Sequence, residues 1–332
     1  MRYYYFLFFH TINDNKGIWV RQEIIISNFG ILTSMKTYLH CIPCLFEQIE
    51  KSAALFNLTD EQAKHIMDEV GSSLNSIPLT ASPPERALVL QQMLSSYLST
   101  DDPYKAIKKE SNDKALELYP IIEKMVNESS HPLHLAIELS CAGNIIDYGV
   151  SPQGIDVEKE IRSIITKSEK KIAKESSRLF AIKEFITSIE KANTLLFLAD
   201  NAGEVVFDKL LLETIKGLYP HLSITVAMRD APILNDALLS DAYEIGLDKS
   251  AQIISSGVPT PGTVLKYASS EFLELFYSSD MVISKGQGNY ESLSEEKRGI
   301  FFLLITKCEV IAKHVNSNVG DILLLNKEPI SQ

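Results

Sequence analysis

The sequence LLFLADNAGEVVFDKLLLETI, at residues 195–215, contains the pattern that decides the fold. Five apolar residues run directly into Asp200 and Asn201, a glycine follows at position 203, and apolar residues then recur at helical spacing. A continuous apolar run of this length is typical of a strand buried on both faces, as in a parallel sheet covered by helices. Ligands of such sheets bind beyond the carboxyl ends of the strands. Asp200 and Asn201 therefore stand where a binding or catalytic site is expected.

The rest of the sequence beyond Ala192 repeats this pattern of an apolar run followed by a helical segment. Short apolar runs alternate with connections that are long enough for crossover helices. The alternation predicts an α/β domain at residues 193–332, a Rossmann-like three-layer α/β/α arrangement with a mainly parallel sheet. The predicted strands span residues 194–200, 223–229, 251–257, 281–286, 301–307 and 321–327.

The sequence before this domain predicts helices only. Two capping boxes mark helix starts, one formed by Thr59 with Gln62 and the other by Ser82 with Glu85. These signals predict an all-helical domain at residues 35–192. Further helical patterns cover residues 41–56, 103–127, 132–146, 156–170 and 176–191.

The first 34 residues differ from the rest of the chain. They contain YYYFLFF at residues 3–9 and the single tryptophan, Trp19, yet they show no sustained period of 2 or 3.6. The apolar run is too short to span a bilayer, and no small-residue cleavage site of a secretory signal follows it. We interpret residues 1–34 as an extension outside the fold. They are either a loosely ordered segment or residues upstream of a start at Met35, and we favour the second.

Composition excludes several classes of function. The formal net charge of -11 argues against nucleic-acid binding, because such proteins neutralise phosphates with Lys and Arg. The sequence has no apolar segment long enough to span a bilayer, so we expect no membrane partner. The chain has neither a G-x-x-x-x-G-K-[ST] loop nor a G-x-G-x-x-G motif after a strand, so a nucleoside-triphosphatase or a dinucleotide-binding enzyme is not supported. Four cysteines are too few for a disulfide framework, which favours a cytoplasmic protein.

Cys41 and Cys44 form a single Cys-x-x-Cys without a second pair. Three interpretations remain open: a redox pair at a helix N-terminus, half of a metal site that a histidine such as His40 or another chain completes, and two small structural residues. We favour the structural interpretation, because buried free cysteine is common.

Polar residues follow four of the predicted strands, so they converge on one edge of the sheet. Asp200, Asn201 and the later Asp236 offer two carboxylates and an amide oxygen, hard donors that suit Mg²⁺ or Mn²⁺. Each residue taken alone is explained as well by helix capping. The strand-end pairs are Asp200 with Asn201, Arg229 with Asp230, Ser256 with Gly257, and Lys285 with Gly286.

Seven segments carry a family resemblance: MKTYLHCIPC, DPYKAIKKESN, CAGNIIDYGV, LADNAGE, RDAPILNDA, SSGVPTPGT and SKGQGNYESL. In this order they resemble the motifs of the DUF89 family, also called the damage-control phosphatase or ARMT1-like metal-binding family. The resemblance covers nearly everything after Met35. It is closest to the archaeal and bacterial branch, whose members begin near a Cys-x-x-Cys.

The resemblance implies a metal-dependent phosphatase that acts on small phosphorylated metabolites such as sugar phosphates or nucleotides. It implies that Asp200, Asn201 and Asp236 bind a divalent cation (Mn²⁺, Mg²⁺, Co²⁺ or Ni²⁺). The eukaryotic sugar-phosphatase branch has an Asp where this chain has Gln287, so substrate preference cannot be taken from that branch and the general base stays open. The family's catalytic pocket is further lined at the positions of Asn144, Asp147, Lys285 and Asn289.

The expected chemistry assigns a role to each strand end. A cation on the aspartates would bind a phosphate oxygen and a water, and Lys285 would place its ammonium on the transferring phosphoryl group. Arg229, Ser256, Gly257 and Gly286 are the candidate substrate-binding residues. Ordinary alternatives stay open: a solvated lysine at 285, a Pro/Gly turn after Ser256, and a helix end at Asn144.

Two other functions remain as alternatives. A methyltransferase that uses S-adenosylmethionine would suit a Rossmann-like sheet, although DNAGE is a poor substitute for a Gly-rich loop. A noncatalytic metal- or ligand-binding protein would use Asp200, Asn201 and Asp236 only to hold an ion. The sequence leaves the oligomeric state open.

Overall fold

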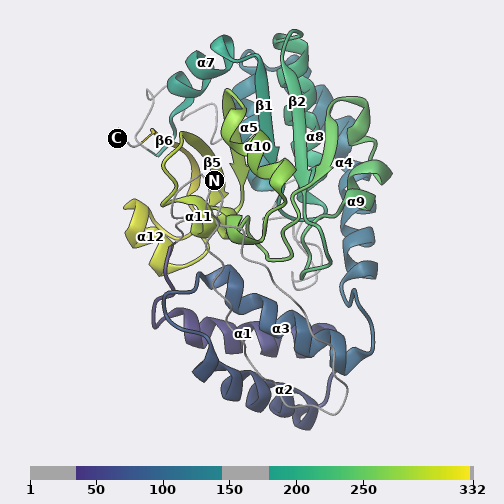
Figure 1. Ribbon diagram of the computed structural model, residues 1–332. Coiled ribbons are helices and arrows are strands. Elements are labelled where there is room, and N and C mark those ends of the chain that lie inside the picture. Colours follow the sequence, from purple (N-terminus) through teal and green to yellow (C-terminus); the bar gives the residue numbers. More distant parts are fainter. Residues whose placement is uncertain (1–34, 144–178, 330–332) are drawn as a thin grey trace.

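The computed structural model describes residues 35–143 and 179–329 of the chain (Figure 1). The interpretation of residues 1–34, the predicted helix at 156–170, and the candidates Asn144 and Asp147 lie outside the described residues.

The first helices form a small bundle with its own apolar core. They are α1 (Cys41–Leu55), α2 (Asp60–Ser73), the short η1 (Leu74–Ser76) and α3 (Pro83–Leu98). Both predicted capping boxes are present at the starts of α2 and α3. The core of the bundle consists of Leu45, Ile49, Ile66, Val70, Leu90, Leu94 and Tyr104.

Three later helices pack mainly on the sheet, although Ile107, near the start of the first of them, also packs against the bundle core. They are α4 (Lys105–Glu128), α5 (Pro132–Ala142) and α7 (Ile182–Lys191). Their buried residues share one apolar core with strands of the sheet. The predicted domain boundary at residue 192 stays a prediction. Of the described helices before residue 192, only α1–α3 have a core that is separate from that of the sheet.

The strands form one sheet in the order β3-β2-β1-β4-β5-β6. All neighbouring pairs are parallel except β5 and β6, which are antiparallel. All six predicted runs are strands, which confirms the mainly parallel α/β sheet. The strands are β1 (Thr194–Leu198), β2 (Ser223–Met228), β3 (Gln252–Ser255), β4 (Met281–Lys285), β5 (Ile300–Ile305) and β6 (Ile322–Lys327).

Alternate residues of β1 face opposite sides of the sheet, as the two-residue period of a strand requires. Leu195 and Phe197 join the core that contains α4, α5, α7 and α8 (Glu204–Leu218). Leu196 and Leu198 join the opposite core, which contains α10 (Ser270–Ser278), α11 (Gln287–Leu293) and α12 (Glu309–Val315). Burial on both faces explains why the strands read as unbroken apolar runs. The remaining described helices are α9 (Leu239–Glu244), η2 (Leu247–Lys249) and η3 (Leu265–Tyr267).

The strand order reverses at β1, which pairs with β2 on one side and β4 on the other. A crevice for ligands is expected at such a switch point, beyond the carboxyl ends of the strands. The bundle α1–α3 lies beyond that end of the sheet (Figure 1). Gln91 of α3 accepts a hydrogen bond from the backbone N–H of Leu234, in the loop after β2, at 2.9 Å. Within the described ranges, no helix is both long and apolar enough to cross a bilayer.

Candidate active site at the sheet switch point

The loops that follow β1 and β2 are joined by backbone hydrogen bonds. The N–H of Ala237 donates to the carbonyl of Asp200 at 2.8 Å, and the N–H of Ala202 donates to the carbonyl of Asn235 at 2.9 Å. Asn201 and Asp236 thus face each other in a short antiparallel pairing. The fold therefore brings the three residues predicted as metal ligands to one place, although they are up to 36 positions apart.

Arg229, the first residue after β2, contacts both aspartates. Its Nε donates to Asp236 Oδ2 at 2.7 Å, and its Nη2 lies 3.4 Å from Asp200 Oδ1. The same guanidinium donates to Thr263 Oγ1 at 3.0 Å and to Asn289 Oδ1 at 3.1 Å. The side chain is 2% exposed. Arg229, predicted as a substrate contact, thus holds the two carboxylates in register.

The environment opposes the ionisation of both aspartates. Burial raises the pKa of Asp200 well above its usual range, and repulsion from Asp236 and Glu204 raises it further. Burial also raises the pKa of Asp236, against the opposing attraction of Arg229. Two ionised carboxylates that share one guanidinium leave one negative charge uncompensated among these three groups. A site that resists a second negative charge in this way favours an added cation.

Asn201 turns its amide nitrogen toward carboxylates. Its Nδ2 donates to Asp200 Oδ2 at 2.9 Å and to Glu204 Oε2 at 3.2 Å. These contacts use the nitrogen, so the amide oxygen is the atom that a cation would bind. Asn112 of α4 supports the same loop, because its Oδ1 accepts the N–H of Gly203 at 2.7 Å.

Lys285, the last residue of β4, is fully buried among carboxylates. Its Nζ lies 2.6 Å from Glu204 Oε1 and 2.7 Å from Asp208 Oδ1, and it donates to the backbone carbonyl and hydroxyl of Ser140, each at 2.8 Å. Burial alone would lower the pKa of Lys285, yet the attraction of Asp208 and Glu204 raises it above its ordinary value. The predicted contact of Lys285 with phosphate stays a prediction, and in this structure its ammonium faces Glu204 and Asp208.

Gly286 and Asn289, which follow β4, complete the surroundings of Asp200 and Arg229. Gly286 has φ of +79°, and a Cβ at this position would collide with the Asp200 carboxylate. Only glycine allows the backbone to approach Asp200 this closely. Asn289 of α11 donates to the carbonyl of Lys285 at 2.7 Å, while its Oδ1 accepts from Arg229 and from the N–H of Thr263. Asn289 therefore orients the guanidinium that holds the aspartates.

Ser256 and Gly257, both predicted as substrate contacts, shape the turn after β3. Ser256 Oγ donates to the carbonyl of Met228 at 2.8 Å and accepts the N–H of Val258 at 3.3 Å. Gly257 has φ of +73° and packs against Ser269. Their part in binding substrate stays a prediction.

Sequence reasoning missed three polar residues that support the site and left the role of a fourth, Asn112, open. Thr263 follows a Pro/Gly turn that looks ordinary, and Asn112 sits in a predicted helix where a surface capping role was as plausible as a contact with the site. Glu204 and Asp208 stand four positions apart on α8, a spacing that is also common on solvated helix faces. A stronger signal was available, because residues 205–212 are apolar except for Asp208 and Lys209.

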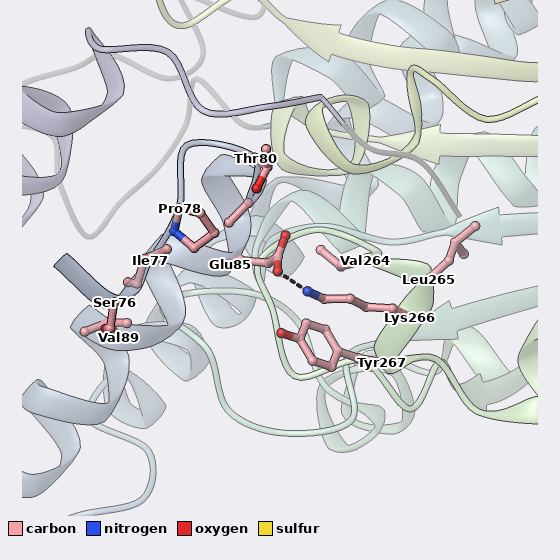
Figure 2. Close-up of a pocket in the computed structure, with 11 residues that line it drawn as sticks. Ser76, Ile77, Pro78, Thr80, Glu85, Val89, Val264, Leu265, Lys266 and Tyr267 are labelled. Carbon is pink, nitrogen blue, oxygen red and sulfur yellow. Dashed lines mark hydrogen bonds and ion pairs between the residues drawn. The ribbon is translucent and has the colours of Figure 1, made fainter. Parts of the chain in front are cut away.

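A cavity of about 390 Å³ lies where the bundle meets η3. Ile77, Pro78 and Val89 line it from the bundle, and Val264 and Tyr267 line it from the other side. Figure 2 shows Glu85 and Lys266 pointing toward each other across it, in an ion pair. The wall formed by residues 264–267 directly follows Thr263, which contacts Arg229. The cavity therefore borders the segment that contributes to the aspartate site.

The Cys-x-x-Cys begins helix α1, and both of its thiols are free. Burial raises the pKa of Cys41 and of Cys44, and the nearby Cys308 raises both further. An activated thiol needs a lowered pKa, so this environment does not favour the redox interpretation.

The donor atoms at the aspartate site fit a hard divalent cation. Across residues 35–143 and 179–329, no three His, Cys, Asp or Glu side chains gather closely enough to hold a metal ion. Asp200, Asn201 and Asp236 differ from such a group because one of the three donors is an amide. Two carboxylates and an amide oxygen match the preferences of Mg²⁺ or Mn²⁺ and not those of a thiol-binding metal.

Comparisons with known proteins agree with this architecture. The family model of the damage-control phosphatase ARMT1-like domain matches residues 37–323. The chain is 30% identical over 301 residues to a damage-control phosphatase of Pyrococcus horikoshii, covering 89% of this chain and 99% of that protein. It is also 30% identical over 297 residues to a damage-control phosphatase of Archaeoglobus fulgidus, covering 87% of this chain and 98% of that protein. An uncharacterized protein of Methanocaldococcus jannaschii is 32% identical over 308 residues, which cover 89% of this chain and 96% of that one.

A solved structure is similar over the same length. The crystal structure of a DUF89 family protein from Pyrococcus horikoshii superposes with a TM-score of 0.77 and 29% sequence identity, covering 88% of this chain and all of that one. The family match, the shared sequence and the common fold lead to one conclusion: the chain belongs to the damage-control phosphatase ARMT1-like (DUF89) family.

Proposed function

We propose that this protein is a metal-dependent phosphatase that hydrolyses small phosphorylated metabolites. One observation carries the proposal: Asp200 and Asp236 are buried together at the switch point of the sheet, where they share a single guanidinium and face Asn201. The damage-control phosphatases among its relatives support the reaction class.

Asp200, Asn201 and Asp236 would hold the cation through two carboxylates and one amide oxygen. When bound, a divalent cation would supply charge neutralisation at a phosphate oxygen and lower the pKa of a coordinated water. Arg229 keeps the two carboxylates side by side, and Asn289 keeps Arg229 in place. Gly286 lets the chain pass Asp200 without displacing it. Positioning of this kind is the main contribution that a protein makes to phosphoryl transfer.

The proposal also has to say which side chains would contact the phosphate of the substrate. Lys285, as a phosphate contact, would need to turn its ammonium away from at least one of Glu204 and Asp208. Arg229 likewise contacts two carboxylates. The roles of Lys285, Ser256, Gly257, Asn144 and Asp147 in substrate binding are predictions that mutagenesis can separate.

The organic part of the substrate is proposed to occupy the cavity lined by Val89 and Val264, the residue that follows Thr263 in the chain. Its volume, about 390 Å³, suits a small metabolite and lies within the usual range for ligand pockets. Its lining mixes apolar side chains with the Glu85–Lys266 ion pair and the Tyr267 ring. A polar metabolite with a compact carbon skeleton fits such a lining better than a long acyl chain does.

The proposal is tested by release of inorganic phosphate from a panel of sugar phosphates, nucleotides and phosphopantetheine compounds. Mn²⁺, Mg²⁺, Co²⁺ and Ni²⁺ are supplied in turn, with a chelator as the blank. We expect turnover that depends on the metal and falls by orders of magnitude in Asp200→Asn, which is nearly isosteric and keeps the fold. Absence of turnover with every metal would favour a noncatalytic binding protein. Methyl transfer from S-adenosylmethionine instead of hydrolysis would favour the methyltransferase alternative.

A further inference from the structure

We infer that Glu204 is a positioning residue that orients the amide of Asn201 toward the bound cation, and that Lys285 holds Glu204 in place for this purpose. This inference rests on the proposed function, because it needs the cation site at Asp200, Asn201 and Asp236. Glu204 is the last residue of the LADNAGE segment, but that segment assigns no role to Glu204 and no link between it and Asn201.

The first step is the geometry of the Glu204 carboxylate. Its two oxygens have different partners: Oε2 lies 3.2 Å from Asn201 Nδ2, and Oε1 lies 2.6 Å from Lys285 Nζ. The side chain is 2% exposed, so water does not compete for these contacts. One carboxylate therefore connects a proposed metal ligand to a buried ammonium.

The second step is the orientation of Asn201. A side-chain amide presents either its oxygen or its nitrogen to a given point, and only the oxygen binds a cation. Glu204 and Asp200 both accept hydrogen bonds from Nδ2. Two acceptors on the nitrogen side fix which end of the amide is available to a cation. Polar groups that orient ligands in this way commonly change metal affinity by about 10- to 100-fold when they are removed.

The third step is the rigidity of Glu204 itself. Lys285 donates to Ser140 on α5 and lies against Asp208 on α8, so its ammonium is held from several directions. Ser140 Oγ in turn donates to Asp208 Oδ1 at 2.6 Å. The ammonium is therefore fixed relative to α8, the helix that carries Glu204. Asn201, supported through Glu204 by this buried network, therefore keeps its orientation before a cation binds.

The experiment measures Mn²⁺ affinity by titration calorimetry on three variants. Glu204→Asp keeps the charge but is one methylene too short to reach both Asn201 and Lys285. Glu204→Gln keeps the length and removes the charge. Asp208→Asn is the matched control, because it removes a charge from the same ammonium without touching Asn201. We expect about tenfold or greater loss of Mn²⁺ affinity in both Glu204 variants and a smaller loss in Asp208→Asn.

The pattern across the variants separates positioning from simple charge. If the carboxylate only adds negative potential, Glu204→Asp binds Mn²⁺ like the wild type and Glu204→Gln resembles Asp208→Asn, and the inference is overturned. A second measurement is a double-mutant cycle with Asn201→Ala, in which Glu204→Asp should cause no further loss of affinity. If Glu204→Gln does not fold, Glu204→Asp still gives the answer. Wild-type protein that binds none of Mn²⁺, Mg²⁺, Co²⁺ and Ni²⁺ would refute the proposed function itself, which is a different outcome.

Discussion

Replacing Gly286 with alanine should damage the site both through the backbone and through the Asp200 side chain. The backbone at Gly286 has φ of +79° and ψ of 163°, a region that residues with a Cβ almost never adopt. Holding alanine there costs about 1–3 kcal/mol. The new methyl group would also overlap the Asp200 carboxylate, since even the farther oxygen, Oδ1, would lie 2.9 Å from it.

The two effects add, so we expect Gly286→Ala to lower the free energy of unfolding by at least about 3 kcal/mol. The corresponding fall in melting temperature is roughly 6–12 °C at about 2–4 °C per kcal/mol. Displacement of Asp200 should also remove metal-dependent phosphate release in protein that remains folded. Urea unfolding and phosphate release measure the two losses separately.

Gly217 provides the control for this variant. It lies in α8, and a Cβ at this position would meet nothing within 4 Å. Gly217→Ala should therefore leave activity unchanged and raise stability by up to about 1 kcal/mol. Wild-type stability and activity in Gly286→Ala would show that the backbone does not approach Asp200 as described.

Three further predictions follow from the same geometry. Lys285→Ala should cost about 3–5 kcal/mol of stability in urea unfolding, because it strands buried carboxylates, and wild-type stability would contradict the ion pairs. It should also weaken Mn²⁺ binding, because Glu204 loses the partner that holds it. If Lys285 contacts phosphate as well, kcat measured at saturating Mn²⁺ should fall by about 10²–10³. Burial raises the pKa of Asp208 from 3.8 to about 7, so its carboxyl binds a proton more tightly in the folded state than in the unfolded state. The protonated carboxyl therefore stabilises the folded state fully below the unfolded pKa, and this stabilisation is lost as the pH rises through 7. Asp208→Asn should therefore flatten the stability profile between about pH 4 and 7, and an unchanged slope there would refute this assignment. Val89→Trp should fill the cavity lined by Val89 and Val264, raising KM for a bulky phosphorylated metabolite but not for acetyl phosphate, and equal effects on both substrates would exclude the cavity as a substrate site.

The sheet could be predicted from the sequence because its strands are buried on both faces. Leu195–Leu198 alternate between two apolar cores, so every residue of the run is apolar. The same pattern does not specify strand direction, and the antiparallel pairing of β6 with β5 was not anticipated in detail. Helix patterns likewise indicate an apolar face without identifying what covers it. For this reason the sequence grouped α4 and α5 with the first helices, whereas their core residues pack with the sheet.

The candidate site was predictable where its residues directly follow strands. Asp200, Asn201 and Arg229 come after β1 and β2, and the common edge of a parallel sheet brings them together. The buried pairs of Lys285 were not predictable. Glu204 and Asp208 are 81 and 77 positions away from it, and nothing in the local pattern pairs them. A lysine at a strand end was therefore interpreted as a free phosphate contact.

This difference bears on where the positive charge for a phosphate comes from. In the described part of the chain, Arg229 and Lys285 are the buried cations at the site, and each contacts two carboxylates. A phosphate dianion would gain little from them unless they exchanged partners, because each already faces two carboxylates. A cation on Asp200, Asn201 and Asp236 would add positive charge beyond that of Lys307, whose attraction lowers the pKa of both aspartates. The ion pairs therefore support the proposal that phosphate release depends on a divalent metal. Full turnover in a chelator would mean that Arg229 or Lys285 leaves its carboxylates when substrate binds.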